Sequence, residues 1–250
     1  MVKKAKYSAS VLVIGDEILS GRTQDTNSNY IAKKMAEIGI DTSEIRVIPD
    51  IKEVIIESVN ELREKNDYLF TTGGIGPTHD DITAESIALA FGVKIELNES
   101  AFSVLKKYYE EIGSPFNEVR QRMARIPVGA TLIENPVSKA PGFKIENVFV
   151  FAGIPKIMIA MLENSLEFLH KGNIVHSQSV KVDAVEGDIA DTLSLMDSED
   201  SDLRIGSYPF FNSKVDFGVN VVIKSVDKDK LSKSVNKFKE FLNKNSLNFD

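Results

Sequence analysis

Apolar positions in the first two thirds of the chain switch between continuous runs and helical spacing. Residues 11–14 form a continuous apolar run that ends at Gly15, which is typical of a strand covered on both faces. Ile31, Met35 and Ile38 then recur at helical spacing, which predicts an amphipathic helix. A strand followed at this distance by a helix predicts one unit of an α/β sheet.

The same alternation continues to residue 169. The pattern predicts further strands over 44–48, 68–70, 130–133 and 143–151, the last being a strand pair or one bent strand with a turn at 146–147. It predicts helices over 54–62 and 82–90, two helices within 99–125 that separate near 113–115, and a helix over 155–169. This order favours an α/β fold with a doubly wound, mostly parallel sheet.

The pattern changes near residues 171–173, where we expect a domain boundary. We therefore predict a first domain over 1–172 and a second over 173–250. The second domain is expected to be a small α+β unit, with strands over 179–185, 203–207 and 215–224 and helices over 189–196 and 231–242. Phe210 and Phe211 in this unit are either an exposed patch or part of its core.

Composition and charge narrow the class of protein. The chain has 250 residues, no cysteine and a net charge of −7. Nucleic acids and anionic membrane surfaces select basic proteins, so neither is an expected partner. The lack of cysteine excludes disulfides, thiolate metal sites and a cysteine nucleophile. No apolar run approaches the roughly 20 residues that span a bilayer, and we expect a soluble, cytoplasmic protein.

Candidate chemistry gathers where three of the predicted strands end. These strands end in the segments GDEILSG, PD and TTGGIGPTHDD. In open α/β sheets, ligands bind at the carboxyl ends of the parallel strands. We therefore expect four acidic side chains of these segments to converge on one rim: Glu17, Asp50, Asp80 and Asp81.

The glycine segment fits an anion site without matching a standard nucleotide motif. It lacks the Lys-Ser/Thr pair of a P-loop, and His79 stands where a dinucleotide fingerprint has its third glycine. The backbone N–H groups of a glycine loop at a helix N-terminus can still hold an anion. The alternative is a simple turn in which Thr78 and Asp81 form a capping box. Spacing alone does not choose between the two.

Adjacent carboxylates repel a phosphate but attract a cation. Clustered carboxylates destabilise one another unless a cation or a shared proton relieves them, and Mg²⁺ binds one or two carboxylates together with water and substrate phosphates. We therefore expect the glycine N–H groups to hold phosphate oxygens, and Asp80 and Asp81 to hold a divalent ion that bridges to them. Asn27, which precedes a predicted helix, is by residue type alone an ordinary N-cap, and Asp25, Thr26 or Ser28 could fill the same role.

Five segments, taken together and in this order, carry a family resemblance. GDEILSG, DTNSNYIA, TTGGIGPTHDDIT, NPVSKAPGF and IGSYP resemble the competence/damage-inducible CinA family. The resemblance covers nearly the whole chain and implies a three-layer α/β first domain of the MoaB/Mog molybdopterin-binding fold, followed by a small KH-type domain. Longer members carry an amidase domain, whose activity is not expected here. Because the relatives self-associate, the resemblance also implies a homo-oligomer.

The resemblance further implies an activity and a site. CinA-type first domains are similar to metal-dependent pyrophosphatases that act on ADP-ribose, and other relatives bind molybdopterin or adenine nucleotides. Asp81 and Asp50 match family aspartates and are the expected catalytic residues. The expected ligands of a divalent ion, Mg²⁺ or Co²⁺, are Asp80, Asp81, Glu17 and Asp50. The residues expected to bind a nucleotide or pterin are Thr72, Gly73, Gly74, Gly76, Pro77, Thr78, Asn27, Asn135 and Ser138.

Two segments depart from the family pattern at the expected ligand rim. Ser138-Lys139 replaces the usual Gly-Thr, and in FAGIPKIM Ala152 replaces a proline and Lys156 replaces an acidic residue. Three hypotheses therefore stay open. The first is a pyrophosphatase whose metal ions activate water for attack on phosphorus. The second is a module that binds molybdopterin or a nucleotide without hydrolysis, or serves cofactor assembly by adenylyl transfer, and the third is a scaffold with a vestigial pocket.

Overall fold

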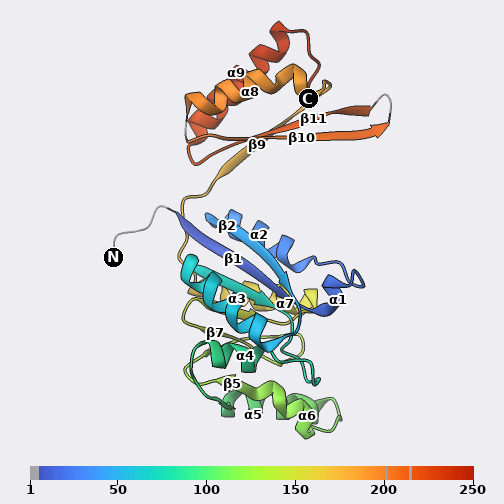
Figure 1. The fold of residues 1–250 in the computed structure, drawn as a ribbon, viewed down its shortest axis with the longest axis vertical. Helices are drawn as coiled ribbons and strands as arrows, with labels where there is room; N and C mark the ends of the chain where they lie inside the picture. Colours follow the sequence, from blue (N-terminus) through green and yellow to red (C-terminus); the bar gives the residue numbers. More distant parts are fainter. Residues whose placement is uncertain (1–5, 201, 214–215) are drawn as a thin grey trace. The chain divides into compact units, whose positions relative to one another are not determined.

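The computed structural model describes residues 6–200, 202–213 and 216–250. The chain divides into two compact units, residues 1–172 and residues 173–250, and each is described by itself (Figure 1). Within the described residues, no helix combines the length and the apolar character that a membrane crossing requires.

The first unit is built on a six-stranded sheet with the order β2-β1-β3-β8-β7-β6. Its strands are β1 (Tyr7–Ile14), β2 (Ile40–Ile48), β3 (Tyr68–Thr72), β6 (Thr131–Ile133), β7 (Gly142–Ile145) and β8 (Val148–Phe151). The pairs β2·β1, β1·β3 and β3·β8 are parallel, whereas β7 is antiparallel to both of its neighbours. The sheet is therefore mostly parallel, which confirms the predicted fold class. Two further strands, β4 (Ile95–Leu97) and β5 (Arg125–Pro127), form a separate antiparallel pair.

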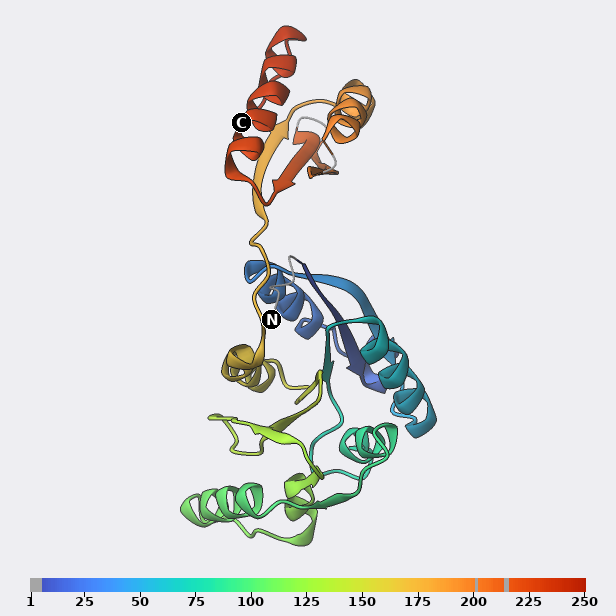
Figure 2. The same cartoon turned by 90° about the vertical axis from the view of Figure 1, so that its left-hand side faces the viewer.

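Helices cover both faces of this sheet (Figure 2). The helices of the unit are α1 (Asp16–Leu19), α2 (Asn27–Glu37), α3 (Lys52–Lys65), α4 (Thr83–Ala90), α5 (Glu99–Glu111), α6 (Glu118–Gln121) and α7 (Pro155–Ser165), with short 3₁₀ turns at Arg122–Ala124 and Leu166–Phe168. Val11 and Val13 of β1 pack with α2 and α7, and Leu12 and Ile14 pack with α3 and α4. Both sets of side chains are buried, which explains why the run is continuously apolar.

Two local predictions need correction. β2 begins at Ile40, four residues before the predicted start at Glu44, because β1 pairs with it from Tyr7↔Ile40 onward, across a bulge. The second helix predicted within 99–125 is only the four-residue α6, because the chain continues into a 3₁₀ turn and then β5. The segment 143–151 is a strand pair, and Glu146 at its turn has a φ of 48°.

The second unit is a three-stranded antiparallel sheet with the order β10-β11-β9 and two helices. Its elements are β9 (His176–Val182), α8 (Glu186–Glu199), β10 (Arg204–Ser213), β11 (Asp216–Ser225) and α9 (Lys228–Lys244). β9 lies three residues earlier than predicted, and Val215, the predicted start of β11, lies outside the described residues. Phe211 is 73% exposed, so it belongs to an exposed patch.

Candidate functional site

The carboxyl ends of the parallel strands gather where the strand order reverses beside β1. β1 lies between β2 and β3, and ligands of open α/β sheets bind at such a reversal. The strand ends are tied together: the Gly15 N–H donates to Ile48 O (3.1 Å) and the Gly73 N–H donates to Phe151 O (3.1 Å). The loops that follow β1, β2, β3 and β8 therefore meet at one rim. We call the loop after β3, residues 73–83, the glycine loop.

The first two glycines of the glycine loop are required by close packing. Gly73 has a φ of 107°, and a Cβ on it would lie 2.0 Å from the carbonyl oxygen of Ile14. Gly74 has a φ of 67°, and a Cβ there would lie 2.2 Å from Thr83 Oγ1 and 3.6 Å from Asp50 Oδ1. Only glycine adopts these angles without strain and tolerates such close neighbours. Gly74 is thus packed against a hydroxyl, with a carboxylate oxygen close by.

The glycine loop leaves several polar groups without partners. Thr83 is fully buried, and its Oγ1 has no hydrogen-bond partner in the described part of the chain. In that same part, the N–H groups of Gly74, Ile75 and Gly76 have no protein acceptor. Buried polar groups are nearly always paired, and successive N–H groups in a turn form an anion site. The loop therefore has hydrogen-bonding capacity that a ligand can use.

Asp50 lies close to three other acidic side chains. Its Oδ2 accepts a hydrogen bond from the N–H of Asp16 at 3.0 Å. Burial raises the pKa of Asp50, and the negative charges of Asp16, Glu17 and Asp80 raise it further. The structure therefore brings Glu17, Asp50 and Asp80 into one electrostatic neighbourhood.

The Asp81 side chain points towards Thr78. Its Oδ2 accepts hydrogen bonds from the N–H (2.8 Å) and the hydroxyl (2.6 Å) of Thr78, and it lines a hollow of about 20 Å³ together with Gly76 and Arg122. Helix α4 begins only at Thr83, and Ile82 is its N-cap. The capping-box alternative is therefore wrong, because the Thr78–Asp81 pair closes the loop ahead of the helix.

The carboxylates around Asp50 are not arranged as a metal-binding site. Among the residues that the structure describes, no group of three or more Asp, Glu or His side chains is placed to hold a metal ion. Asp80 is exposed, and the nearby Thr78 side chain, followed by a backbone N–H, lowers the pKa of its carboxyl. Any ion at this rim would thus need donors beyond the carboxylates, as Mg²⁺ usually does.

Asn27 ties the start of α2 to the strand ends. Its Nδ2 donates to Thr72 Oγ1 (2.8 Å) and to Gly153 O (2.7 Å), while its buried Oδ1 has no partner within the described residues. The first N–H groups of α2 are accepted by Asp25, whose Oδ1 lies 2.9 Å from the N of Asn27 and 3.2 Å from the N of Ser28. The N-cap interpretation of Asn27 is therefore wrong, because Thr26 occupies the N-cap position and Asp25 supplies the accepting oxygen. Asn27 also lines a hollow of about 50 Å³ that includes Glu17, Thr72, Gly73 and Gly153.

Asn135 is used within its own turn, residues 135–141, which we call the asparagine turn. Its Nδ2 donates to Ser138 Oγ (2.6 Å) and Ala140 O (2.8 Å), and its Oδ1 accepts the N–H groups of Val137 (2.9 Å) and Ser138 (3.2 Å). Both amide hydrogens and the amide oxygen are thereby engaged. In this structure the Asn135 side chain shapes the rim, and its predicted contact with a ligand stays a prediction.

The remaining predicted residues lie in the glycine loop, and two neighbours were not predicted. Pro77 is half-buried between Gly76 and the exposed Thr78. Thr83 was missed although it closes the glycine motif, and its signal was a hydroxyl residue at the helix start. Arg122 donates to Thr78 O at 3.2 Å. No sequence signal places Arg122 here, because it comes from the segment before β5.

Comparison with known proteins gives matches over both units. Residues 10–171 match the family described as "Probable molybdopterin binding domain", and residues 174–250 match "FAD synthase, middle domain". A protein of Archaeoglobus fulgidus is 37% identical over 93% of this chain and 97% of its own length. A CinA-like protein of Thermosipho melanesiensis is 37% identical over 68% of this chain, which spans only 44% of that protein.

A solved structure agrees with these sequence matches. The crystal structure of the protein CinA from Thermoplasma acidophilum is 33% identical, with a TM-score of 0.60 over 64% of this chain and 98% of that one. Together with the family match over residues 10–171, this establishes the fold of the first unit and its relationship to CinA-like proteins. The chain belongs to the molybdopterin-binding-domain family.

Proposed function

We propose that this member of the molybdopterin-binding-domain family hydrolyses the diphosphate bond of ADP-ribose or a similar dinucleotide with the help of a divalent metal ion. The observation that carries the proposal is the group of polar atoms around Gly74 that lack a partner among the described residues. The hydroxyl of buried Thr83 and Oδ1 of Asp50 lie beside Gly74, and the N–H groups of the glycine loop that have no protein acceptor are next to them in sequence. An anion and a cation would therefore find donors and acceptors side by side.

The oxygen atoms at this rim fit a hard cation. Mg²⁺ prefers oxygen ligands, takes one or two carboxylates and completes its shell with water and substrate phosphates. Asp50 and Thr83 would hold the ion, with Asp80 or Glu17 in electrostatic reach of Asp50. When bound, the ion would neutralise charge that develops on the diphosphate oxygens. Mg²⁺ and Co²⁺ are the ions to test.

The chain's own residues would position the substrate. The N–H groups of Gly74, Ile75 and Gly76 would bind diphosphate oxygens, because they have no protein acceptor in the described residues. The absence of a side chain at Gly74 lets a phosphate approach the main chain. Asp81 would hold this loop in shape through its two hydrogen bonds from Thr78. Asp81 is then a positioning residue in this proposal.

The variant Asp50→Asn tests the proposal directly. We expect metal-dependent release of AMP from ADP-ribose to fall by roughly a hundredfold or more, the scale of losing one preorganised charge interaction at a reacting centre. Asn keeps an oxygen that accepts the Asp16 N–H. Asp191→Asn, an exposed carboxylate of the second unit, is the matched control and should retain activity. Unchanged turnover in Asp50→Asn, or no metal-dependent release from the wild-type chain, would refute the proposal.

The same variant should be more stable at neutral pH. Burial and like charges raise the pKa of Asp50 above its unfolded value, so the folded state binds this proton more tightly and loses stability as pH rises between the two pKa values. Asp50→Asn removes that penalty. In EDTA, we expect a higher melting temperature than wild type at pH 7 and a difference that shrinks as pH falls towards about 4, the usual pKa of Asp. A lower melting temperature for the variant at pH 7 would contradict this.

Binding without hydrolysis is the second candidate function. It is favoured by the family match itself, which is described as molybdopterin binding. Thermal-shift measurements with ADP-ribose, FAD, ATP and molybdopterin, each with and without Mg²⁺ or Co²⁺, separate the two, because a ligand that binds only the folded state raises its stability. A shift without any metal-dependent AMP release would favour the binding module.

A further inference from the structure

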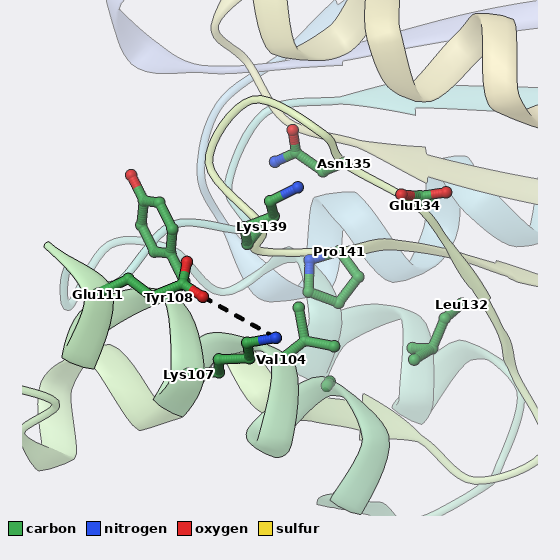
Figure 3. A pocket seen from close by; sticks show the side chains of 10 residues that line it. Val104, Lys107, Tyr108, Glu111, Leu132, Glu134, Asn135, Lys139 and Pro141 are labelled. Carbon is green, nitrogen blue, oxygen red and sulfur yellow. Dashed lines mark ion pairs between the residues drawn. The ribbon is translucent and has the colours of Figure 1, made fainter.

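A larger cavity lies beside the glycine loop, between α5 and the segment 132–141 (Figure 3). Its volume is about 530 Å³, within the range of small-molecule sites. We call it the α5 cavity. Pro141 borders both this cavity and the small hollow that contains Gly76 and Asp81. The α5 cavity thus shares one wall residue with the hollow at Gly76 of the glycine loop.

The walls of the α5 cavity suit a planar ring. Val104 and Tyr108 of α5 face Leu132 and Pro141 of the opposite segment across it (Figure 3). Val104 is 48% exposed, so a ligand would cover apolar surface that is now in contact with water. An aromatic side chain beside aliphatic ones is a favourable surface for a heteroaromatic ring.

One cation of the α5 cavity has no partner. Lys107 pairs with Glu111 at 3.9 Å on the same helix. Lys139, in contrast, makes no ion pair or side-chain hydrogen bond with any described residue. Its backbone has a φ of 63°, a conformation that glycine adopts more easily. Position 139 is thus a lysine although its backbone conformation suits glycine. Its ammonium group lies at the cavity without an ion-pair partner among the described residues.

The asparagine turn holds Lys139 in this place. The N–H of Lys139 donates to Asn135 O at 3.1 Å, and the Asn135 amide closes the turn on both sides of it. The turn fixes the backbone that carries the Lys139 side chain, so binding of an anion has to order the side chain alone and not the loop. Glu134 also lines the cavity, and its carboxylate accepts hydrogen bonds from hydroxyl groups and repels additional phosphates.

We propose that the α5 cavity binds the nucleoside monophosphate half of the substrate, with the base against Tyr108 and one phosphate oxygen on Lys139. Its place next to the glycine loop makes it the subsite for the half of the dinucleotide that is released as the nucleoside monophosphate. This identification of the half-substrate rests on the proposed function. Binding of the nucleotide to the cavity does not, since it needs no metal and no turnover.

The experiment measures binding by calorimetry in EDTA, in the Asp50→Asn background, with AMP, adenosine and ribose 5-phosphate. Lys139→Gly should weaken AMP binding roughly tenfold and leave adenosine unchanged, because only AMP carries the anion. Tyr108→Ala should weaken the binding of AMP and of adenosine by a similar factor and leave the binding of ribose 5-phosphate unchanged. Tyr108→Phe should keep the affinity for both, because it keeps the ring.

Lys106→Ala is the matched control, because Lys106 is an exposed lysine of α5 that does not line the cavity. It should bind AMP like the parent chain. Equal AMP affinity in the parent, Lys139→Gly and Tyr108→Ala would overturn the proposal, as would the absence of AMP binding to the parent. If the expected pattern appears but the wild-type chain does not hydrolyse ADP-ribose, the subsite stands and the hydrolase proposal falls.

Discussion

The glycine loop and the asparagine turn both place residues in the left-handed backbone region at the same rim, yet they treat their polar groups in opposite ways. In the asparagine turn, one amide satisfies itself and its neighbours through four hydrogen bonds. In the glycine loop, a buried hydroxyl and three N–H groups have no protein partner within the described chain. A turn that saturates its own polar groups holds its shape alone. A loop with unsaturated polar groups depends on its neighbours for its shape. Its free donors and acceptors remain able to bind a ligand.

The largest expected effect is that of Gly73→Ala. The new Cβ would lie 2.0 Å from the carbonyl oxygen of Ile14 at a φ of 107°, so β1 and the glycine loop have to separate. We expect the free energy of unfolding to fall by about 4 kcal/mol, in the upper range of single substitutions. Denaturation in urea measures it.

Gly92→Ala is the control for this substitution. Gly92 has a φ of 64°, but a Cβ on it would meet no neighbouring atom within 4 Å, so the cost should be that of the backbone conformation alone, about 1 kcal/mol. Similar losses in the two variants would mean that the glycine loop does not depend on the end of β1.

A smaller loss is expected for Asn135→Ala. The substitution leaves the N–H groups of Val137 and Ser138 and the carbonyl of Ala140 without their partner. We expect the free energy of unfolding to fall by about 2 kcal/mol, because unpaired buried groups are costly. Asn164→Ala, which removes one exposed hydrogen bond to Glu134 O, should cost less than about 1 kcal/mol. An equal cost for both would show that the asparagine turn is not self-supporting.

The smallest effect on stability is expected for Thr83→Val. Valine has the shape of threonine without the hydroxyl, and this hydroxyl has no partner in the described chain. The free energy of unfolding should therefore change by less than about 1 kcal/mol, or rise. The proposal also predicts that the melting-temperature increase caused by Mg²⁺ with ADP-ribose is reduced in Thr83→Val and kept in Thr83→Ser. A clear loss of stability without ligand would instead mean that the hydroxyl has a structural role.

Much of the fold follows from local patterns. The apolar run of β1, the helical spacing of α2 and the turn at Glu146 are each encoded within a few residues, and the mostly parallel sheet follows from their order. The start of β2 was missed, because residues 40–43 become a strand only by pairing with β1. The exposure of Phe211 was open for a similar reason. Two adjacent aromatic residues occur both in cores and on surfaces, and the sequence alone does not show which elements pack against them.

One part of the candidate site was also predictable from the sequence, and another part was not. The sequence marks the glycine loop and the acidic residues at the strand ends, and the structure brings Glu17, Asp80 and Asp50 into one neighbourhood. The partners of individual side chains were not predictable. Asp81 accepts hydrogen bonds from Thr78, and among the several candidates for the helix cap it is Asp25 that accepts the first N–H groups of α2. Which of several nearby polar groups forms a given hydrogen bond depends on distances of a few tenths of an ångström.

The sequence by itself determined the α/β alternation, the glycines that permit positive φ and the acidic residues at the strand ends. Those features depend on backbone conformation and on periodicity, which act over short stretches of chain. Only the tertiary structure decided that the Asn135 amide bonds within its own turn, and that buried Thr83 and Lys139 at the α5 cavity have no side-chain partner among the described residues. Burial and pairing are properties of atoms that are distant in sequence, so they are defined only once the sheet, the helices and the loops have been packed together.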